Sequence, residues 1–411
     1  MCVPKLRFKA DDGSEFPEWE ERRLGDVCDI VGCGTPDTEK SEYWNEDINW
    51  FTPSEIGTTK YAVKSSRQIS KLGILKSSAK LLPRGTILLT SRATLGEMAI
   101  TRQECCTNQG FQSLIIKPGY LNEFIYYCQS VIKKYCKKHA SGSTFLEIGK
   151  KEISECKLGI PSLPEQRKIA AFLSAIDTHL ELLKSELSKW EQFKKGMLQK
   201  IFHQEIRFKA DDGSEYPEWV EKRLGEEGYF YGGLSGKGKD DFGHGNGRFL
   251  TYMNIYKNPF AKQDIVGYVD IRNTEKQNNV QYGDVLFTQS SETVDEVGLS
   301  SVYLYDDHPY LNSFCVGFRF NDLRNICPTF IGYCMRSNSV RKNIMLMGQG
   351  ISRINIGTKR LATIRYELPS LPEQQKIADL FSSIDQMIEL SKQEVEYLES
   401  YKKGLLQQMF V

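Results

Sequence analysis

The chain carries the same segment twice, 200 residues apart. RFKADDGSEFPEWEERRLG at residues 7–25 returns as RFKADDGSEYPEWVEKRLG at residues 207–225, with three differences in 19 positions. The stretches that follow, a first core at roughly residues 26–141 and a second core at roughly 226–349, differ in both sequence and length. Repeated segments around unlike cores predict a pseudo-twofold scaffold that presents two different binding surfaces.

A second pair of near-copies closes each half. IPSLPEQ at residues 160–166 and LPSLPEQ at 368–374 both lead into long segments, which end in FKKGMLQKIF and YKKGLLQQMF. With 411 residues, 40% of them hydrophobic, the chain is long enough to bury two domain cores. The repeats divide it into a first globular domain at 1–160, a central long helix at 161–205, a second globular domain at 206–368 and a C-terminal long helix at 369–411.

The two cores have the pattern of mixed α/β (α+β) domains. Short β-rich runs bounded by turn residues predict strands, and one amphipathic run in each core predicts a helix. The expected strands are residues 86–90, 113–116, 284–288 and 314–320, and the expected helices are 121–138 and 328–342.

The two closing segments predict long helices of about 38 residues each. Pro164 and Pro372 suit a first helical turn, and apolar residues then recur in steps of four and three, the pattern of a coiled coil. Lys194 and Lys402 interrupt the pattern at equivalent points. The apolar positions are Ile169, Leu173, Ile176, Leu180, Leu183, Leu187, Trp190, Met197 and Ile201, and then Ile377, Phe381, Ile384, Ile388, Val395, Leu398, Leu405 and Met409.

A helix of this length must bury its apolar stripe on a partner, and the other long helix has the same register. We therefore expect an antiparallel coiled coil that joins the two domains and acts as a ruler between them. The alternative is that each helix packs only on its own core.

Charge is segregated along the chain although the net charge is only +1. Residues 60–157 carry 17 Lys and Arg against 6 Asp and Glu, and residues 319–365 carry 9 against a single Asp. One such run is usually a solvated face, but two in matching positions favour contact with a polyanion.

Cysteine usage and hydropathy place the chain in the cytoplasm. The 11 cysteines are scattered without any C-x-x-C pair, which is typical of a reduced protein. The sequence has neither the apolar region of a signal peptide nor 18 continuous apolar residues, so we expect no contact with a membrane.

Three loops in each core carry side chains suited to DNA, at residues 90–94, 108–110 and 141–144 of the first core and at 288–292, 312–313 and 349–353 of the second. Arg, Asn and Gln match guanine and adenine edges, Ser and Thr suit either base, and Lys neutralises phosphates. For each residue the alternative is an ordinary loop or surface side chain. The candidates in the first core are Thr90, Ser91, Arg92, Asn108, Gln109, Ser143, Lys133, Lys134, Lys137 and Lys138, and those in the second are Gln289, Ser290, Asn312, Ser313, Arg353, Lys359 and Arg360.

The sequence offers no convincing catalytic or metal site. Asn258-Pro259-Phe260 lacks the second proline of an adenine methyltransferase loop, and Gly236-Lys237-Gly238 lacks the spacing and the Ser/Thr of a phosphate-binding loop. The five histidines are isolated, without zinc-type spacing to cysteine. We expect neither a catalytic residue nor a metal or cofactor site on this chain.

The paired LPSLPEQ-x-KIA and PEW-x-x-x-RLG segments resemble the specificity subunit of type I restriction-modification systems. The resemblance covers nearly the whole chain. It implies two target-recognition domains that each read half of an asymmetric, bipartite DNA site, joined by helices that set the spacer. It also implies a non-catalytic subunit that binds double-stranded DNA, two methyltransferase subunits and restriction/translocase subunits, with S-adenosylmethionine held by the methyltransferase.

The sequence is also compatible with two other classes of protein. One is a self-sufficient methyltransferase or nuclease, and the other is a coiled-coil assembly factor without sequence preference. The charge segregation argues against the second.

Overall fold

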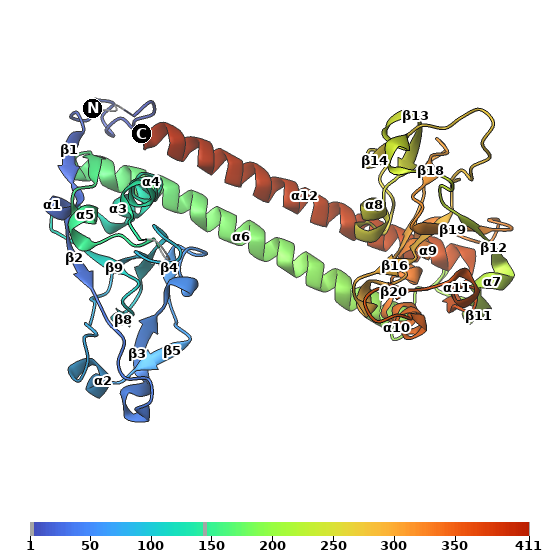
Figure 1. Cartoon of the computed structure of the whole chain (residues 1–411), viewed down its shortest axis with the longest axis horizontal. Helices are drawn as coiled ribbons and strands as arrows, with labels where there is room; N and C mark the ends of the chain where they lie inside the picture. Colours follow the sequence, from blue (N-terminus) through green and yellow to red (C-terminus); the bar gives the residue numbers. More distant parts are fainter. Residues whose placement is uncertain (1–3, 143–145, 411) are drawn as a thin grey trace. The chain divides into compact units, whose positions relative to one another are not determined.

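The computed structural model describes residues 4–142 and 146–410, and the chain forms two compact units. The first comprises Met1–Lys184 with Gln393–Val411, and the second comprises Ser185–Lys392. The predicted long helices are present as α6 (Leu163–Phe202) and α12 (Leu371–Met409) (Figure 1). Each unit therefore contains one core, the start of one long helix and the end of the other.

The first core is a mixed α/β fold built on two sheets. The five-stranded sheet has the order β2-β9-β6-β7-β4, and the three-stranded sheet has the order β5-β3-β8. A two-stranded pair, β1 with β10, connects the repeated N-terminal segment to the strand that precedes α6. The strands are β1 (Glu20–Arg23), β2 (Cys28–Gly32), β3 (Trp44–Phe51), β4 (Tyr61–Ala62), β5 (Arg67–Ile69), β6 (Ile87–Leu89), β7 (Met98–Thr101), β8 (Cys105–Thr107), β9 (Gln112–Ile116) and β10 (Lys157–Ile160).

Short helices complete the first core, and one prediction is corrected here. The helix expected at residues 121–138 is two helices, because the chain tightens at Cys128 (φ −74°, ψ 5°). The helices are α1 (Leu24–Val27), η1 (Ser41–Tyr43), η2 (Pro53–Glu55), α2 (Lys71–Leu75), α3 (Asn122–Tyr127), α4 (Gln129–His139) and α5 (Lys150–Ser154), where η denotes a 3-10 helix.

The second core repeats this plan with different strands. A four-stranded sheet has the order β12-β19-β15-β17, a three-stranded sheet has the order β14-β13-β18, and β16 pairs with β20. Strands β11 and β21 pair as β1 and β10 do. The strands are β11 (Val220–Arg223), β12 (Gly228–Gly232), β13 (Phe242–Leu250), β14 (Val266–Val269), β15 (Val285–Thr288), β16 (Ser290–Ser291), β17 (Ser300–Val302), β18 (Tyr310–Leu311), β19 (Cys315–Phe320), β20 (Ile354–Asn355) and β21 (Arg365–Leu368).

The helix expected at residues 328–342 is also two helices. Ser337 has extended backbone (φ −63°, ψ 152°), which ends the first helix and starts the second. The four predicted strands are confirmed as β6, β9, β15 and β19, within one residue at each end. The helices of this core are α7 (Leu224–Glu227), η3 (Lys239–Asp241), α8 (Tyr252–Lys257), η4 (Val294–Glu296), α9 (Pro328–Met335), α10 (Asn338–Met347) and α11 (Thr358–Leu361).

The long helices pair antiparallel within each unit, as predicted. In the first unit Asp177 and Lys184 of α6 bind Lys402 and Glu399 of α12, so residue numbers rise on one helix as they fall on the other. In the second unit Glu191 and Lys194 bind Lys392 and Asp385 in the same sense.

The ends of the long helices are exchanged between the two cores. Leu405, Met409 and Phe410 of the α12 end belong to the buried apolar cluster of the first core. Ile201 and Phe202 of the α6 end belong to the cluster of the second. The alternative that each helix packs only on its own core is therefore wrong.

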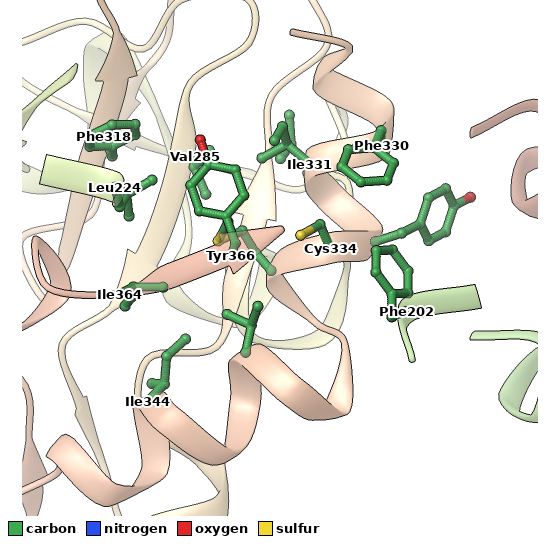
Figure 2. Close-up of a cluster of buried hydrophobic side chains, with 14 of the residues drawn as sticks. Phe202, Leu224, Val285, Phe318, Phe330, Ile331, Cys334, Ile344, Ile364 and Tyr366 are labelled. Atoms are coloured by element: carbon green, nitrogen blue, oxygen red, sulfur yellow. The ribbon is translucent and has the colours of Figure 1, made fainter. Parts of the chain in front are cut away.

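Aromatic contacts explain why the tryptophan is repeated. Trp19 packs on Phe124 and Phe410, while Trp219 packs on Phe330 and Phe202. Figure 2 shows part of the buried apolar cluster of the second core, where side chains of α9, β21 and the end of α6 gather together. In both copies, the tryptophan of the PEW motif packs against the end of the long helix that comes from the other half.

The PEQ motif is explained by hydrogen bonds at the start of each long helix. The fully buried carboxylate of Glu165 accepts from Nε and Nη2 of Arg7 at 3.2 and 2.9 Å. Glu373 and Arg207 repeat this geometry at 3.2 and 3.0 Å. The glutamine that follows in each motif accepts from a backbone N–H near the start of the core helix, at Leu121 or Cys327.

The two lysines that interrupt the apolar stripes have specific partners. Lys402 binds Asp177, which accepts a 2.6 Å hydrogen bond from the Tyr127 hydroxyl. In the second unit Lys194 binds Asp385, which accepts from Tyr333 at 2.7 Å. Each triad ties a core helix to both long helices, so the interruption fixes their register at a polar point.

Candidate nucleic-acid interface

The three candidate loops of the first core are brought together by backbone hydrogen bonds. Ser91 N donates to Gly110 O at 2.8 Å, and Ile148 N donates to Ser91 O at 3.1 Å. Ser141 and Glu147, on either side of residues 143–145, exchange backbone hydrogen bonds of 3.0 and 2.9 Å. The segment after β6 therefore lies between the other two loops.

The second core brings its three loops together through equivalent bonds. Gln289 N donates to Phe314 O at 3.1 Å, and Ile356 N donates to Gln289 O at 2.9 Å. Gln349 and Asn355 exchange backbone bonds of 2.9 and 2.7 Å. The same backbone frame thus presents different side chains in the two cores.

The two candidate asparagines hold the turns of the second loop. The side-chain oxygen of Asn108 accepts from Gly110 N, and that of Asn312 accepts from Phe314 N, both at 2.9 Å. Gln109 and Ser313, at the tips of these turns, are exposed. Gln109 accepts a 2.7 Å bond from the Thr35 hydroxyl. The tips, and not the asparagine oxygens, are the parts of this loop that face outward.

The residues directly after the central strand are mostly internal. Thr90 and Ser91 are fully buried, and the Thr90 hydroxyl donates to Thr94 O at 2.5 Å. Gln289 and Ser290 are half-buried. These four residues shape the loops, and the structure gives the two buried ones no surface with which to meet a base.

Arg92 is the exposed basic residue of the first loop cluster. Its Nε lies 3.5 Å from a carboxylate oxygen of Glu147, and both side chains are nearly half exposed. An exposed pair of this kind contributes little to stability, so exchanging the carboxylate for a DNA acceptor costs little.

The candidate lysines of α4 divide into two groups. Lys133 is half-buried and binds Glu97, so it is internal. Lys134, Lys137 and Lys138 are exposed, the last two in the final turn of the helix, where a cation is also favoured by the helix dipole. Ser143 lies outside the described residues.

Much of the second basic run makes contacts within the protein, which leaves fewer of its residues for the polyanion contact that the sequence predicts. Six of its nine basic residues have partners within the protein. Of the three candidates in this run, Arg360 donates to Met347 O at 2.6 Å, whereas Arg353 and Lys359 are exposed. The six are Arg319 on Asp284, Arg324 on Asp322, Arg336 and Arg341 on backbone carbonyls, Arg360 on Met347, and Arg365 on Glu221.

Sequence reasoning missed a cleft in the second core. The cleft, of about 410 Å³, lies at the loop cluster. Tyr252, Met253, Glu292 and Phe314 line it together with Arg353. In a sequence, aromatic residues usually indicate a buried core, so only the position of these residues directly after a strand could have indicated the cleft.

The segments that resembled catalytic loops are structural. Lys237 is buried and donates to Asp270 O at 2.5 Å. Asn258 donates to its own helix at Asn254 O, and Phe260 packs on Tyr333. Burial raises the pKa of the Cys28 thiol to about 12 and that of the Cys136 thiol to about 11, which keeps both protonated and poor nucleophiles.

Comparison with known proteins identifies the family. Residues 17–192 and 218–400 each match the domain described as "Type I restriction modification DNA specificity domain". The chain belongs to this family. The match confirms the resemblance drawn from the paired motifs.

Curated relatives carry the corresponding name. The type I restriction enzyme MjaIX specificity subunit of Methanocaldococcus jannaschii is 33% identical over 235 residues, an alignment that spans about half of each chain (54%). The putative MjaX specificity subunit of the same organism is 24% identical over 97% of this chain and 94% of its own. These matches confirm the prediction of a specificity subunit and not an enzyme.

Solved structures share the fold. The crystal structure of the type I S subunit from M. genitalium matches with a TM-score of 0.61 and 18% identity, covering 100% of this chain and 99% of that one. A second match, with a TM-score of 0.59, comes from a study of complex assembly and conformational transition in the type I system. Among residues 4–142 and 146–410, no helix is both long enough and apolar enough to cross a membrane.

Proposed function

We propose that this chain reads an asymmetric, bipartite DNA sequence, with one half-site per core, and positions modification and restriction subunits on it. One observation carries the proposal: equivalent backbone bonds assemble three loops in both cores, while the side chains on those loops differ. A shared frame with unlike loops suits two half-sites of different sequence on one duplex.

The exposed positive charge supports DNA as the ligand. Lys134, Lys137 and Lys138 lie on the surface of the first core, and Lys359 lies on that of the second. Phosphate contacts from such residues release counterions, so affinity should fall steeply with salt. Base selectivity would come from loop residues such as Arg92 and Gln109, because only contacts to base edges discriminate sequence.

The long helices would supply the spacer and the partner sites. The triads at Asp177 and Asp385 fix the register of α6 against α12 in each unit, which suits a rigid ruler. We infer that the chain's partners are two methyltransferase subunits and restriction/translocase subunits, as the resemblance of the repeated motifs implies. The methyltransferase would hold S-adenosylmethionine, and the complex would act in the cytoplasm.

Two assays test the proposal. The purified chain, incubated with labelled S-adenosylmethionine and DNA, should transfer no methyl group until the methyltransferase subunit is added. Transfer by the chain alone would instead support a self-sufficient methyltransferase. Selection of bound duplexes from a random pool should enrich two short sequences at a fixed spacing, and a pool without enrichment would support an assembly factor lacking sequence preference.

A further inference from the structure

The cleft of the second core has no equivalent built from the same residue types in the first. Asn312 N bonds Leu250 O as Asn108 N bonds Phe51 O, at 3.2 and 3.1 Å, so the residues that follow β13 and β3 correspond. Tyr252 and Tyr256 then take the places of Pro53 and Gly57. The second core therefore has two aromatic side chains where the first has none.

A longer loop forms the opposite wall of the cleft. Gly96 N bonds Thr90 O in the first core, and Gly298 N bonds Thr288 O in the second, which leaves five residues in one loop and nine in the other. The four additional residues belong to the segment that contributes Glu292 and Glu296 to the cleft. The second core thus gained carboxylates as well as aromatic rings at this place.

Two arginines, one half-buried and one buried, hold both walls in position. Arg336 donates to the carbonyls of Ile255, Tyr256 and Asn258 at 2.9–3.0 Å, which fixes the end of α8. Arg341, buried under the long loop, donates to Val297 O and Asp295 O at 2.8 Å. These contacts hold both walls from within the protein, so the cleft is preorganised.

Hydrogen bonds also fix the aromatic wall. The Tyr256 hydroxyl binds Glu296, and the Tyr252 hydroxyl donates to Ser290 O at 2.6 Å. The two rings stack 6.1 Å apart. Glu292 and Arg353 remain exposed at the mouth of the cleft, where no hydrogen bond or ion pair engages either charged group among the described residues.

The charges of the cleft select the part of DNA that fits. Two carboxylates against one guanidinium repel a phosphate, which excludes the DNA backbone as the occupant. A base edge satisfies both signs, since guanine presents the O6 and N7 acceptors to arginine and cytosine presents its N4 amino donor to a carboxylate. Phe314 is 60% exposed and Met253 47% exposed, and both offer apolar surface beside these contacts.

We propose that this cleft reads a G·C base pair in the half-site of the second core, with Arg353 donating to guanine and Glu292 accepting from cytosine. The inference rests on the proposed function and names the base pair that this function requires at one position. Arg353 was a candidate from the sequence, whereas Glu292 and the cleft follow from the structure.

The test uses the assembled complex of the chain with its methyltransferase subunits and a duplex pool randomised in both half-sites. Wild type should select a G·C pair at one position that Arg353→Ala relaxes by about 5- to 100-fold, leaving the other half-site unchanged. Glu292→Gln should weaken selection at the same base pair. Arg324→Ala, an exposed arginine that binds Asp322, is the matched control and should change nothing.

A base analogue checks the contact directly. Replacing that guanine by 7-deazaguanine removes the N7 acceptor, which should weaken binding by wild type but not by Arg353→Ala. Three results would overturn the inference: an A·T pair at the affected position, an effect of Arg353→Ala on the other half-site, or no effect of Arg353→Ala on either half-site. Each of them would leave the two-reader function intact. Loss of selection in both half-sites of the wild-type experiment would overturn the proposed function itself.

Discussion

Removal of the arginine that faces the buried PEQ glutamate should destabilise each unit by a similar amount. Glu165 and Glu373 are both fully buried, and each is bound through two oxygens by an arginine whose side chain is 16% exposed. Arg7→Ala or Arg207→Ala leaves an uncompensated buried carboxylate, which costs about 3–5 kcal/mol. For a unit of this size, such a loss corresponds to a melting temperature lower by roughly 10 °C.

Hydrogen exchange separates the two units in this measurement. Arg7→Ala should accelerate exchange of the most protected amides of α3, and Arg207→Ala those of α9, each by the factor that corresponds to the free energy of the lost pair. The control is Lys9→Ala, because Lys9 and Glu15 form a pair that is about two-thirds exposed, worth at most about 1 kcal/mol.

A cost below about 1 kcal/mol at pH 7.5, or costs that differ by more than about 2 kcal/mol between the halves, would refute the equivalence of the two frames.

Three further predictions concern the long helices, the two lysines that interrupt their apolar stripes, and the cysteines. Deletion of one heptad from both α6 and α12 should shorten the preferred DNA spacer by roughly 10 Å, or about three base pairs, measured by duplex selection, and an unchanged spacer would exclude the ruler. Lys402→Met should destabilise its unit by about 2 kcal/mol and Lys194→Met by about 1 kcal/mol in denaturant titrations, since Asp177 is 13% exposed and Asp385 33%, and the reverse order would contradict the burial argument. A thiol reagent at pH 8 should label no more than one of the 11 cysteines before unfolding, because ten are buried free thiols. Burial raises the pKa of thiols such as Cys28 to about 12, and the resulting contribution to stability is fully present below pH 9 and is lost as pH rises toward 12. Alkaline titration should therefore expose these thiols. Rapid labelling at pH 8 would be inconsistent with their burial.

The repeated frame was predictable because its signals are local or duplicated. The heptad spacing predicted α6 and α12, and the shared register predicted their pairing, which the Asp177–Lys402 and Lys194–Asp385 contacts bear out. The short strands were also found within one residue, since turn residues flank them. The two breaks in the core helices were missed, although Ser337 is a residue type that favours a helix N-terminus.

The candidate interface was predictable only as a set of loops. Their convergence depends on backbone bonds between segments far apart in the chain, such as Ser91 with Gly110 and Ile148. The burial of Thr90 and the internal use of Arg336 and Arg341 depend on distant carbonyls that no local pattern encodes. For the same reason the cleft, whose walls come from separate segments, was not visible in the sequence.

We propose that two dissimilar cores on one repeated frame each read their own half-site. The most direct measurement exchanges residues 26–159 for those of another specificity subunit and maps the methylated adenines genome-wide in cells that carry the methyltransferase. We predict that one half of the methylated motif changes while the other half stays the same. A motif in which both halves change, or neither, would contradict the account.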